Sequence, residues 1–210
     1  MSEGAPPLGA LLAAVALLTP LAGVGCAALP LPGGAVASSA VGPAALVERL
    51  PAVAAGFRRG EVRPAASSGA RDGREVGYAT SGGRATAAAT VELLAEDTGA
   101  AAALDAMLAE AQRAGPAREV REAGRFTLAS AGVAGPASSL LCAETVGRYG
   151  RERVAGLVCA GRAGGALLRI RVTMPAGREP ARADPRAFAE AIAAALSGSA
   201  SAAAAVPSSG

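Results

Sequence analysis

Residues 140–162 read LLCAETVGRYGRERVAGLVCAGR, and this stretch decides how the middle of the chain folds. Two apolar runs flank Gly150 and Arg151. Glycine at the first central position of a two-residue turn is typical of a type II′ β-hairpin. We therefore expect two antiparallel strands joined at this turn, with Tyr149 opposite Glu152 as the hydrogen-bonded closing pair.

The same hairpin predicts a disulfide between Cys142 and Cys159. Counting outward from the turn places them opposite each other in a non-hydrogen-bonded pair, where side chains come close enough to be bridged. This register also sets Arg148 opposite Arg153, which is electrostatically unfavourable. A three-residue loop would pair Arg148 with Glu152 and move the cysteines out of register. We expect the two-residue turn.

The cysteine pair has a structural and a functional interpretation. As a covalent staple it would contribute about 3 kcal/mol to stability. The alternatives are a redox-active dithiol and two unpaired buried thiols. The redox reading lacks a C-x-x-C motif, and the chain has no His or Lys to lower a thiol pKa. The staple is the favoured interpretation.

Alternating apolar and polar residues predict strands on both sides of the hairpin. From Ala166 to Met174 the polar positions are Arg169, Arg171 and Thr173, and a proline then ends the strand. A second alternating run extends from Ala85 to Ala95. Weaker patterns predict strands over residues 57–63, 75–81, 119–129, 140–148 and 153–162. Gly82-Gly83 predicts a turn that joins the strand at 75–81 to the run that begins at Ala85.

Two helices are predicted, over residues 98–114 and from Pro185 to about residue 197. Asp97 or Thr98 would cap the first, and Asp184 the second. A short helical turn over residues 44–50 is a weaker expectation. Short connections between strands favour antiparallel pairing. The predicted fold is α+β: a mainly antiparallel sheet of six or seven strands with two helices packed on it.

The amino-terminal 37 residues are interpreted as an export segment. No charged residue occurs between Gly4 and Val47, and the apolar run LGALLAAVALLTPLAGVGCAAL fits the core of a signal peptide. Two processing routes stay open. One is cleavage after Ala35-Val36-Ala37. The other is lipidation of Cys26, because Gly23-Val24-Gly25-Cys26 partly resembles a bacterial lipobox, with Gly23 in place of the usual leucine.

The remaining chain divides into a linker over residues 38–43, a domain over 44–197 and a low-complexity tail over 198–210 that we expect to be disordered. Removal or lipidation of Cys26 leaves an even pair of cysteines, which suits an oxidising compartment. The predicted location is the periplasm or outer envelope, with membrane contact restricted to the amino-terminal segment or a lipid anchor.

Composition excludes several function classes. The chain has no His, which removes His-based triads, His metal sites and imidazole acid–base catalysis. A net charge of +3 with aromatic residues at 2% does not favour nucleic-acid binding. Ser138 and Ser139 lack a G-x-S-x-G elbow, and GRAGGA at 161–166 precedes a strand rather than a helix. No catalytic, metal-binding or cofactor-binding residue is assigned.

Charged side chains on the strands supply the remaining candidates. Glu92 and Glu96 share one face but are about 13 Å apart along a strand, too far to share a proton. Arg169 and Arg171 lie on one face of the strongest strand and are candidates for binding a carboxylate or phosphate. The favoured alternative is that all four side chains face solvent, as charged side chains on strands usually do.

Three segments carry a resemblance to a known class of proteins. LVERLPAVAAGFRRGEV (46–62), REVGYATSGGRATAAATVEL (74–93) and LLRIRVTMP (167–175) resemble small exported proteobacterial proteins of unknown function. The element order of residues 44–197 is also similar to the sandwich fold of the extrinsic photosystem II oxygen-evolving subunit and related envelope lipoproteins. This resemblance implies a fold and transfers no site residues.

The sequence therefore predicts an exported cell-envelope protein that serves as a non-enzymatic binding or accessory module. The expected partner is an envelope protein or a small anionic ligand. The alternatives are an exported hydrolase or transferase that uses carboxylate or arginine chemistry and, third, a thiol-redox protein.

Overall fold

The computed structural model describes residues 41–66, 72–81, 86–113, 118–129, 139–176 and 183–197. The export segment, Cys26 and the carboxy-terminal tail predicted from the sequence lie outside these ranges. None of the helices in the described ranges is long and apolar enough to cross a bilayer.

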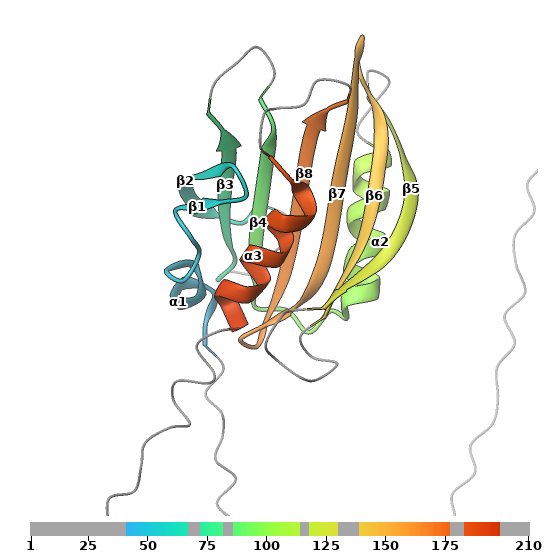
Figure 1. Cartoon of the computed structure of the whole chain (residues 1–210). Helices are drawn as coiled ribbons and strands as arrows, with labels where there is room; N and C mark the ends of the chain where they lie inside the picture. Colours follow the sequence, from blue (N-terminus) through green and yellow to red (C-terminus); the bar gives the residue numbers. More distant parts are fainter. Residues whose placement is uncertain are drawn as a thin grey trace, which may run out of the picture. The chain divides into compact units, whose positions relative to one another are not determined.

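One antiparallel sheet of eight strands organises the domain, in the order β1-β2-β3-β4-β8-β7-β6-β5 (Figure 1). The predicted α+β class and antiparallel pairing are confirmed, whereas the predicted strand number is slightly too low. The missed strand, β1, has two residues, too few for an alternating pattern to be visible. The strands are β1 (Val53–Ala54), β2 (Phe57–Pro64), β3 (Arg74–Thr80), β4 (Ala88–Leu94), β5 (Arg118–Ala129), β6 (Ser139–Tyr149), β7 (Glu152–Ala163) and β8 (Ala166–Pro175).

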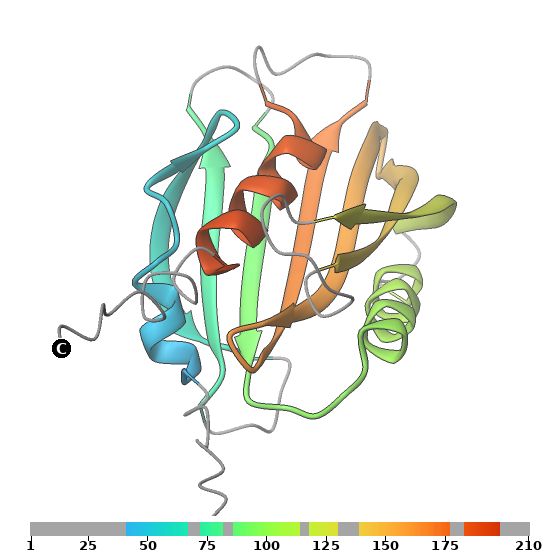
Figure 2. The same ribbon diagram turned by 60° about the horizontal axis from the view of Figure 1, so that its bottom comes forward.

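Three helices, rather than the two predicted, pack on this sheet: α1 (Pro43–Val47), α2 (Ala100–Gln112) and α3 (Pro185–Ser197). The additional helix, α1, lies within the weakly expected turn at 44–50. Helices α1 and α3 share one hydrophobic cluster with the sheet, and α2 forms a separate cluster. Figures 1 and 2 show α3 crossing one face of the sheet while α2 lies behind β5, β6 and β7.

The face under α3 holds the larger core. Phe188 of α3 is fully buried, with its ring centroid 4.8 Å from that of Phe57 and 5.0 Å from that of Tyr78. The Tyr78 hydroxyl donates a hydrogen bond of 3.0 Å to the carbonyl of Pro51. Burial raises the pKa of Tyr78 to about 12, although nearby Arg59 acts in the opposite direction. Three aromatic rings thus anchor α3 to the sheet.

The face under α2 is thinner and partly polar. Leu104, Met107 and Leu108 of α2 pack on Leu167 and Val158 of the sheet. Helix α2 buries only one stripe of side chains, and several of the strand residues that face it are small. Charged side chains therefore fit beside the helix.

The two long helices begin differently. The prediction that Asp97 or Thr98 caps α2 is wrong: Gly99 occupies the N-cap, and no side chain hydrogen-bonds there. For α3 the prediction is confirmed in detail, since Asp184 Oδ1 accepts from the backbone N–H of Arg186 at 2.8 Å and of Ala187 at 3.1 Å.

The predicted hairpin is confirmed in its register. Cys142 lies opposite Cys159, and the two form a disulfide with a Cα–Cα distance of 4.1 Å. Gly150 has a φ of 60° and Arg151 does not share a positive φ, as a type II′ turn requires.

The like-charge pair that opposed this register is present as well. Arg148 lies opposite Arg153 on β7, and Glu119 of β5 lies opposite Arg148 on its other side. The register thus places a carboxylate of a third strand next to the two arginines, and this neighbour could not be seen while the hairpin was considered alone.

Candidate functional site

Charged residues of the central strands lie under α2. Register places Glu92 of β4 opposite Arg169 of β8, and Thr90 opposite Arg171, so all four share one face of the sheet. The prediction that this face is solvent-exposed is wrong for two of them: 13% of the Glu92 side chain and 11% of the Arg169 side chain is exposed. Helix α2 covers the face because its apolar stripe needs a partner.

These residues form a chain of ion pairs. Arg169 Nη1 lies 3.0 Å from Glu92 Oε2, and Arg169 Nη2 lies 3.4 Å from Glu110 Oε2 on α2. The same Glu110 oxygen lies 3.1 Å from Arg171 Nη2. Glu110 therefore joins the helix to both arginines of β8. The other carboxylate considered from the sequence, Glu96, lies beyond the end of β4, where its backbone carbonyl accepts from Arg162.

A pocket of about 490 Å³ opens where α2 ends. Its walls come from α2, β5, β6, β7 and β8. The charged and polar side chains that line it are Glu110, Arg113, Arg118, Thr145, Tyr149, Arg171 and Thr173, and valines 120, 154, 158 and 172 supply apolar wall.

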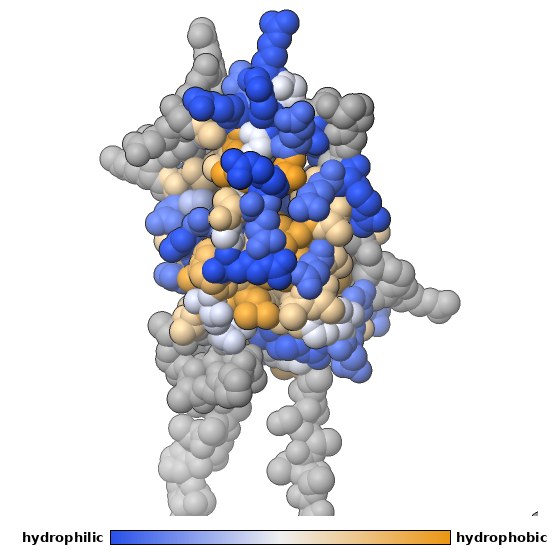
Figure 3. All heavy atoms as spheres, turned by 90° about the vertical axis from the view of Figure 1, so that its right-hand side faces the viewer, coloured by the Kyte–Doolittle hydropathy of each residue, from blue (hydrophilic) through white to orange (hydrophobic). Residues whose placement is uncertain are grey.

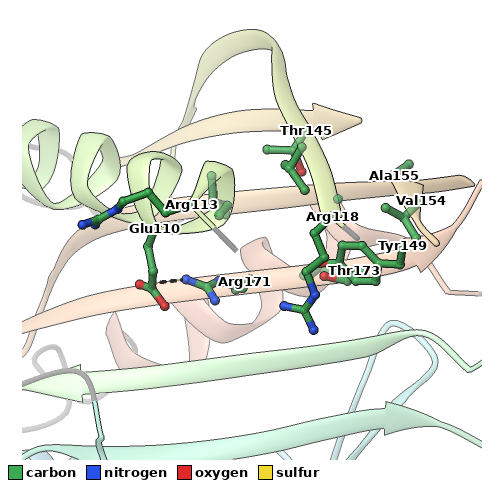
Figure 4. A pocket seen from close by; sticks show the side chains of 14 residues that line it. Glu110, Arg113, Arg118, Thr145, Tyr149, Val154, Ala155, Arg171 and Thr173 are labelled. Carbon is green, nitrogen blue, oxygen red and sulfur yellow. Dashed lines mark ion pairs between the residues drawn. The ribbon is translucent and has the colours of Figure 1, made fainter. Parts of the chain in front are cut away.

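Two arginines face this pocket from opposite sides of the hairpin. Arg171 comes from β8 and Arg118 from β5, and their guanidinium groups lie beside the same space (Figure 4). Arg118 stacks over the Tyr149 ring, with its Cζ 4.6 Å from the ring centroid. Arg113 points away, and its Nε donates to the carbonyl of Ala109.

Two glycines of the hairpin are closely packed: Gly156 lines this pocket, and Gly147 lies against β5. A Cβ at Gly156 would lie 2.7 Å from both Thr145 Oγ1 and the Val172 carbonyl oxygen. A Cβ at Gly147 would lie 2.0 Å from the Glu119 carbonyl oxygen. Both positions therefore exclude larger residues. Glycine at 156 keeps the space above this part of the pocket wall free, and glycine at 147 lets β5 approach β6 closely.

A second pocket of about 310 Å³ lies on the other side of α2. Arg171 and Glu110 line both pockets, whereas Arg169, Glu75 and Glu92 line only this second one of the two. The larger pocket has a single carboxylate, Glu110, among its lining residues. An anion is therefore favoured in the larger pocket over the smaller one.

Cys142 and Cys159 are both fully buried within the core, as expected of a structural disulfide rather than a redox-active one. Nowhere in the described ranges do three or more His, Cys, Asp or Glu side chains gather so that they could hold a metal ion.

The structure separates the two arginines singled out from the sequence. Arg169 is covered and ion-paired, whereas Arg171 has 37% of its side chain exposed and lines the pocket. Sequence reasoning missed Arg118, Tyr149 and Glu110. The turn signal at Tyr149 was visible, but its pairing with Arg118 depends on β5 returning beside β6 across a long connection.

No protein-family model matches this chain, and a search of the curated proteins also finds no match.

Proposed function

We propose that the chain is an exported cell-envelope protein whose α+β domain is a non-enzymatic binding module for a small organic anion. The pocket beside α2 is the proposed site. The observation that carries the proposal is the placement of Arg118 and Arg171, from two different strands, beside one pocket that also presents Tyr149.

Arginine suits this task because its planar guanidinium stays charged and matches the two oxygens of a carboxylate or phosphate. The hydroxyls of Thr145 and Thr173 add neutral hydrogen-bonding groups at the same pocket. Valine side chains from β5, β7 and β8 line the rest. A ligand with an anionic head and an apolar body is therefore the best fit.

Export is supported by two independent features. The amino-terminal sequence carries a long uncharged apolar run. The fully buried disulfide fits an oxidising compartment, since cytosolic thiols are kept reduced. Fractionation of the producing cell tests this part: the protein is expected in the envelope fraction, and recovery with the cytosol would contradict it.

Ligand titration tests the binding part. Benzoate and phenyl phosphate are the probes, and benzamide is the matched neutral compound. We expect chemical-shift changes in the pocket with the two anions and none with benzamide. Arg118→Gln and Arg171→Gln should each weaken binding about tenfold, the factor for one charge-assisted hydrogen-bonded contact.

Arg58→Gln is the control, because Arg58 is an exposed arginine of β2 that does not line the pocket. Its affinity should equal that of the unmodified protein. Equal weakening by all three substitutions would show that binding follows net charge, and it would overturn the assignment of this pocket.

A further inference from the structure

Strand β5 forms one edge of the sheet. It is 12 residues long, and among the strands that the structure describes it pairs with β6 alone. The opposite edge begins with the two-residue β1. A long edge strand is a template for another strand, because half of its backbone N–H and C=O groups face outward.

The disulfide shows which backbone groups of β5 face outward. A Cα–Cα distance of 4.1 Å marks Cys142 and Cys159 as a non-hydrogen-bonded pair. Even-numbered residues of β6 therefore direct their backbone groups toward β5, where Arg148 lies opposite Glu119 and Val146 opposite Arg121. By alternation, Arg118, Val120 and Glu122 present their N–H and C=O groups to the free edge.

The side chains of this segment are complementary to themselves. Residues 118–122 read REVRE. If a second copy runs antiparallel about Val120, Arg118 lies opposite Glu122 and Glu119 lies opposite Arg121. Both Val120 residues meet at the centre. The residues that then pair through their backbones are the three that face outward, so hydrogen bonding and charge agree on one register.

We propose that a second copy of this chain docks on β5, so that the two sheets join through an antiparallel β5–β5 pairing centred on Val120. The interface is isologous, as two-fold dimers require. It carries Arg118–Glu122 contacts on the face under α2 and Glu119–Arg121 contacts on the other face.

Neighbouring registers are disfavoured by charge. A shift of the centre to Arg121 sets two Arg121 side chains against each other. A shift to Glu119 does the same for two Glu119 side chains. Like charges directly opposite are destabilising, so slippage is opposed in both directions.

The participating side chains are accessible. Arg118, Glu119 and Arg121 are exposed, and Glu122 is half-buried where Arg125 Nε donates to its Oε1 at 2.6 Å. Figure 3 looks onto the side of the domain where β5 lies and shows hydrophilic side chains interspersed with apolar ones. The bulge between Glu122 and Gly124 limits the pairing to this short segment. The dimer is consequently a weak one.

The proposed dimer and the proposed ligand site share Arg118, but they can be tested separately through residues that belong to the dimer interface alone. Arg118 and Val120 line the pocket of about 490 Å³ proposed for the anion, whereas Glu119 and Arg121 do not line it. Substitutions at 119 and 121 therefore test the interface and leave the pocket arginines in place. Anion binding that survives while dimerisation fails, or the reverse, separates the two proposals.

Analytical ultracentrifugation of the purified protein, over a concentration series reaching about 1 mM, is the test. The unmodified protein should show a concentration-dependent dimer. Glu119→Arg alone and Arg121→Glu alone should each be monomeric, because like charges then face each other. An equimolar mixture of these two variants should dimerise again, and the double variant should also dimerise.

The control is the double reversal Glu61→Arg/Arg63→Glu on β2. These residues flank Val62 with the same charge pattern and form an exposed pair at 3.5 Å. This variant should dimerise like the unmodified protein. A monomer at every concentration would overturn the proposal. So would a dimer that resists both single reversals, a mixture that stays monomeric, or loss of the dimer in the β2 control.

Discussion

Arg169 of β8 and Glu92 of β4 lie directly opposite each other and form an ion pair of 3.0 Å beneath α2. Their side chains are 11% and 13% exposed, so the pair is largely withdrawn from water. A helix therefore packs on a face of the sheet that carries charge, and these two charges pair with each other beneath it.

Removing one member of this pair should be costly. We expect Glu92→Leu to lower the free energy of unfolding by about 3 kcal/mol, because it leaves the Arg169 guanidinium short of a close partner under α2. Urea denaturation measures the effect. The double variant Glu92→Leu/Arg169→Met should recover most of the loss, since well-packed apolar residues replace such pairs at little cost.

The matched control for this prediction is Glu61→Leu, which breaks the exposed pair with Arg63. Its cost should stay below about 1 kcal/mol because water screens the pair. Equal costs for Glu61→Leu and Glu92→Leu would show that burial under α2 adds nothing to the interaction.

The disulfide should act as a staple. Replacing both cysteines with alanine removes a cross-link that spans 17 residues and should cost about 3 kcal/mol. For a domain of this size the melting temperature should fall by about 6–12 °C. Calorimetry measures the change. Non-reducing mass spectrometry checks the premise, and two free thiols in protein purified from the envelope would contradict it.

Tyr78 should make the fold sensitive to alkali. Its pKa is raised to about 12 in the folded chain, mainly by burial, from an ordinary value near 10. Folding thus favours the neutral phenol, so its contribution to the free energy of unfolding is fully present below pH 10. It is lost as the pH rises from about 10 to 12, by up to about 3 kcal/mol.

Denaturation with urea at a series of alkaline pH values measures this loss. Tyr78→Phe should flatten the profile between pH 10 and 12 while costing about 1 kcal/mol near neutrality, where the hydrogen bond to Pro51 is lost. Tyr149→Phe is the control and should keep the alkaline loss. A profile unchanged by Tyr78→Phe would assign the alkaline sensitivity to another group.

Glu110 should weaken the binding of anions at the proposed site. Its Oε2 lies 3.1 Å from Arg171 Nη2 at the pocket wall, so it competes with an anionic ligand for that guanidinium. Glu110→Gln should tighten benzoate binding about fivefold, as expected from releasing an ion pair worth about 1 kcal/mol. Calorimetric titration measures the affinity, with Glu190→Gln on α3 as the control for net charge. Weaker binding by Glu110→Gln would show that the carboxylate itself contacts the ligand.

Much of the fold was predictable because two local rules govern it. Alternation located seven of the strands, and the turn at Gly150 set the hairpin register down to the Cys142–Cys159 pair. The N-cap of α3 was predictable because Asp184 and Pro185 form a local signal. The N-cap of α2 was not, because Asp97 and Thr98 are both good capping residues and yet the helix begins after Gly99, with no side-chain cap.

The candidate site was predictable in part. The alternating pattern put Arg169 and Arg171 on one face, and the structure confirms that they share it. Their different exposure could not be predicted, because it depends on α2: Arg169 is covered, whereas Arg171 keeps 37% of its side chain exposed at the pocket wall. Arg118 and Tyr149 meet across β5 and β6, whose pairing is not determined by any short segment.

Local sequence patterns are enough to predict which side chains share a face, where the hairpin turns and which cysteines meet, because these depend on a period of two residues and on turn geometry. Three further features depend on the packing of distant elements: which polar face α2 covers, that Glu119 lies opposite Arg148, and where a pocket remains. The reason is physical: a strand pattern assigns side chains to a face but carries no information about which distant element packs against it.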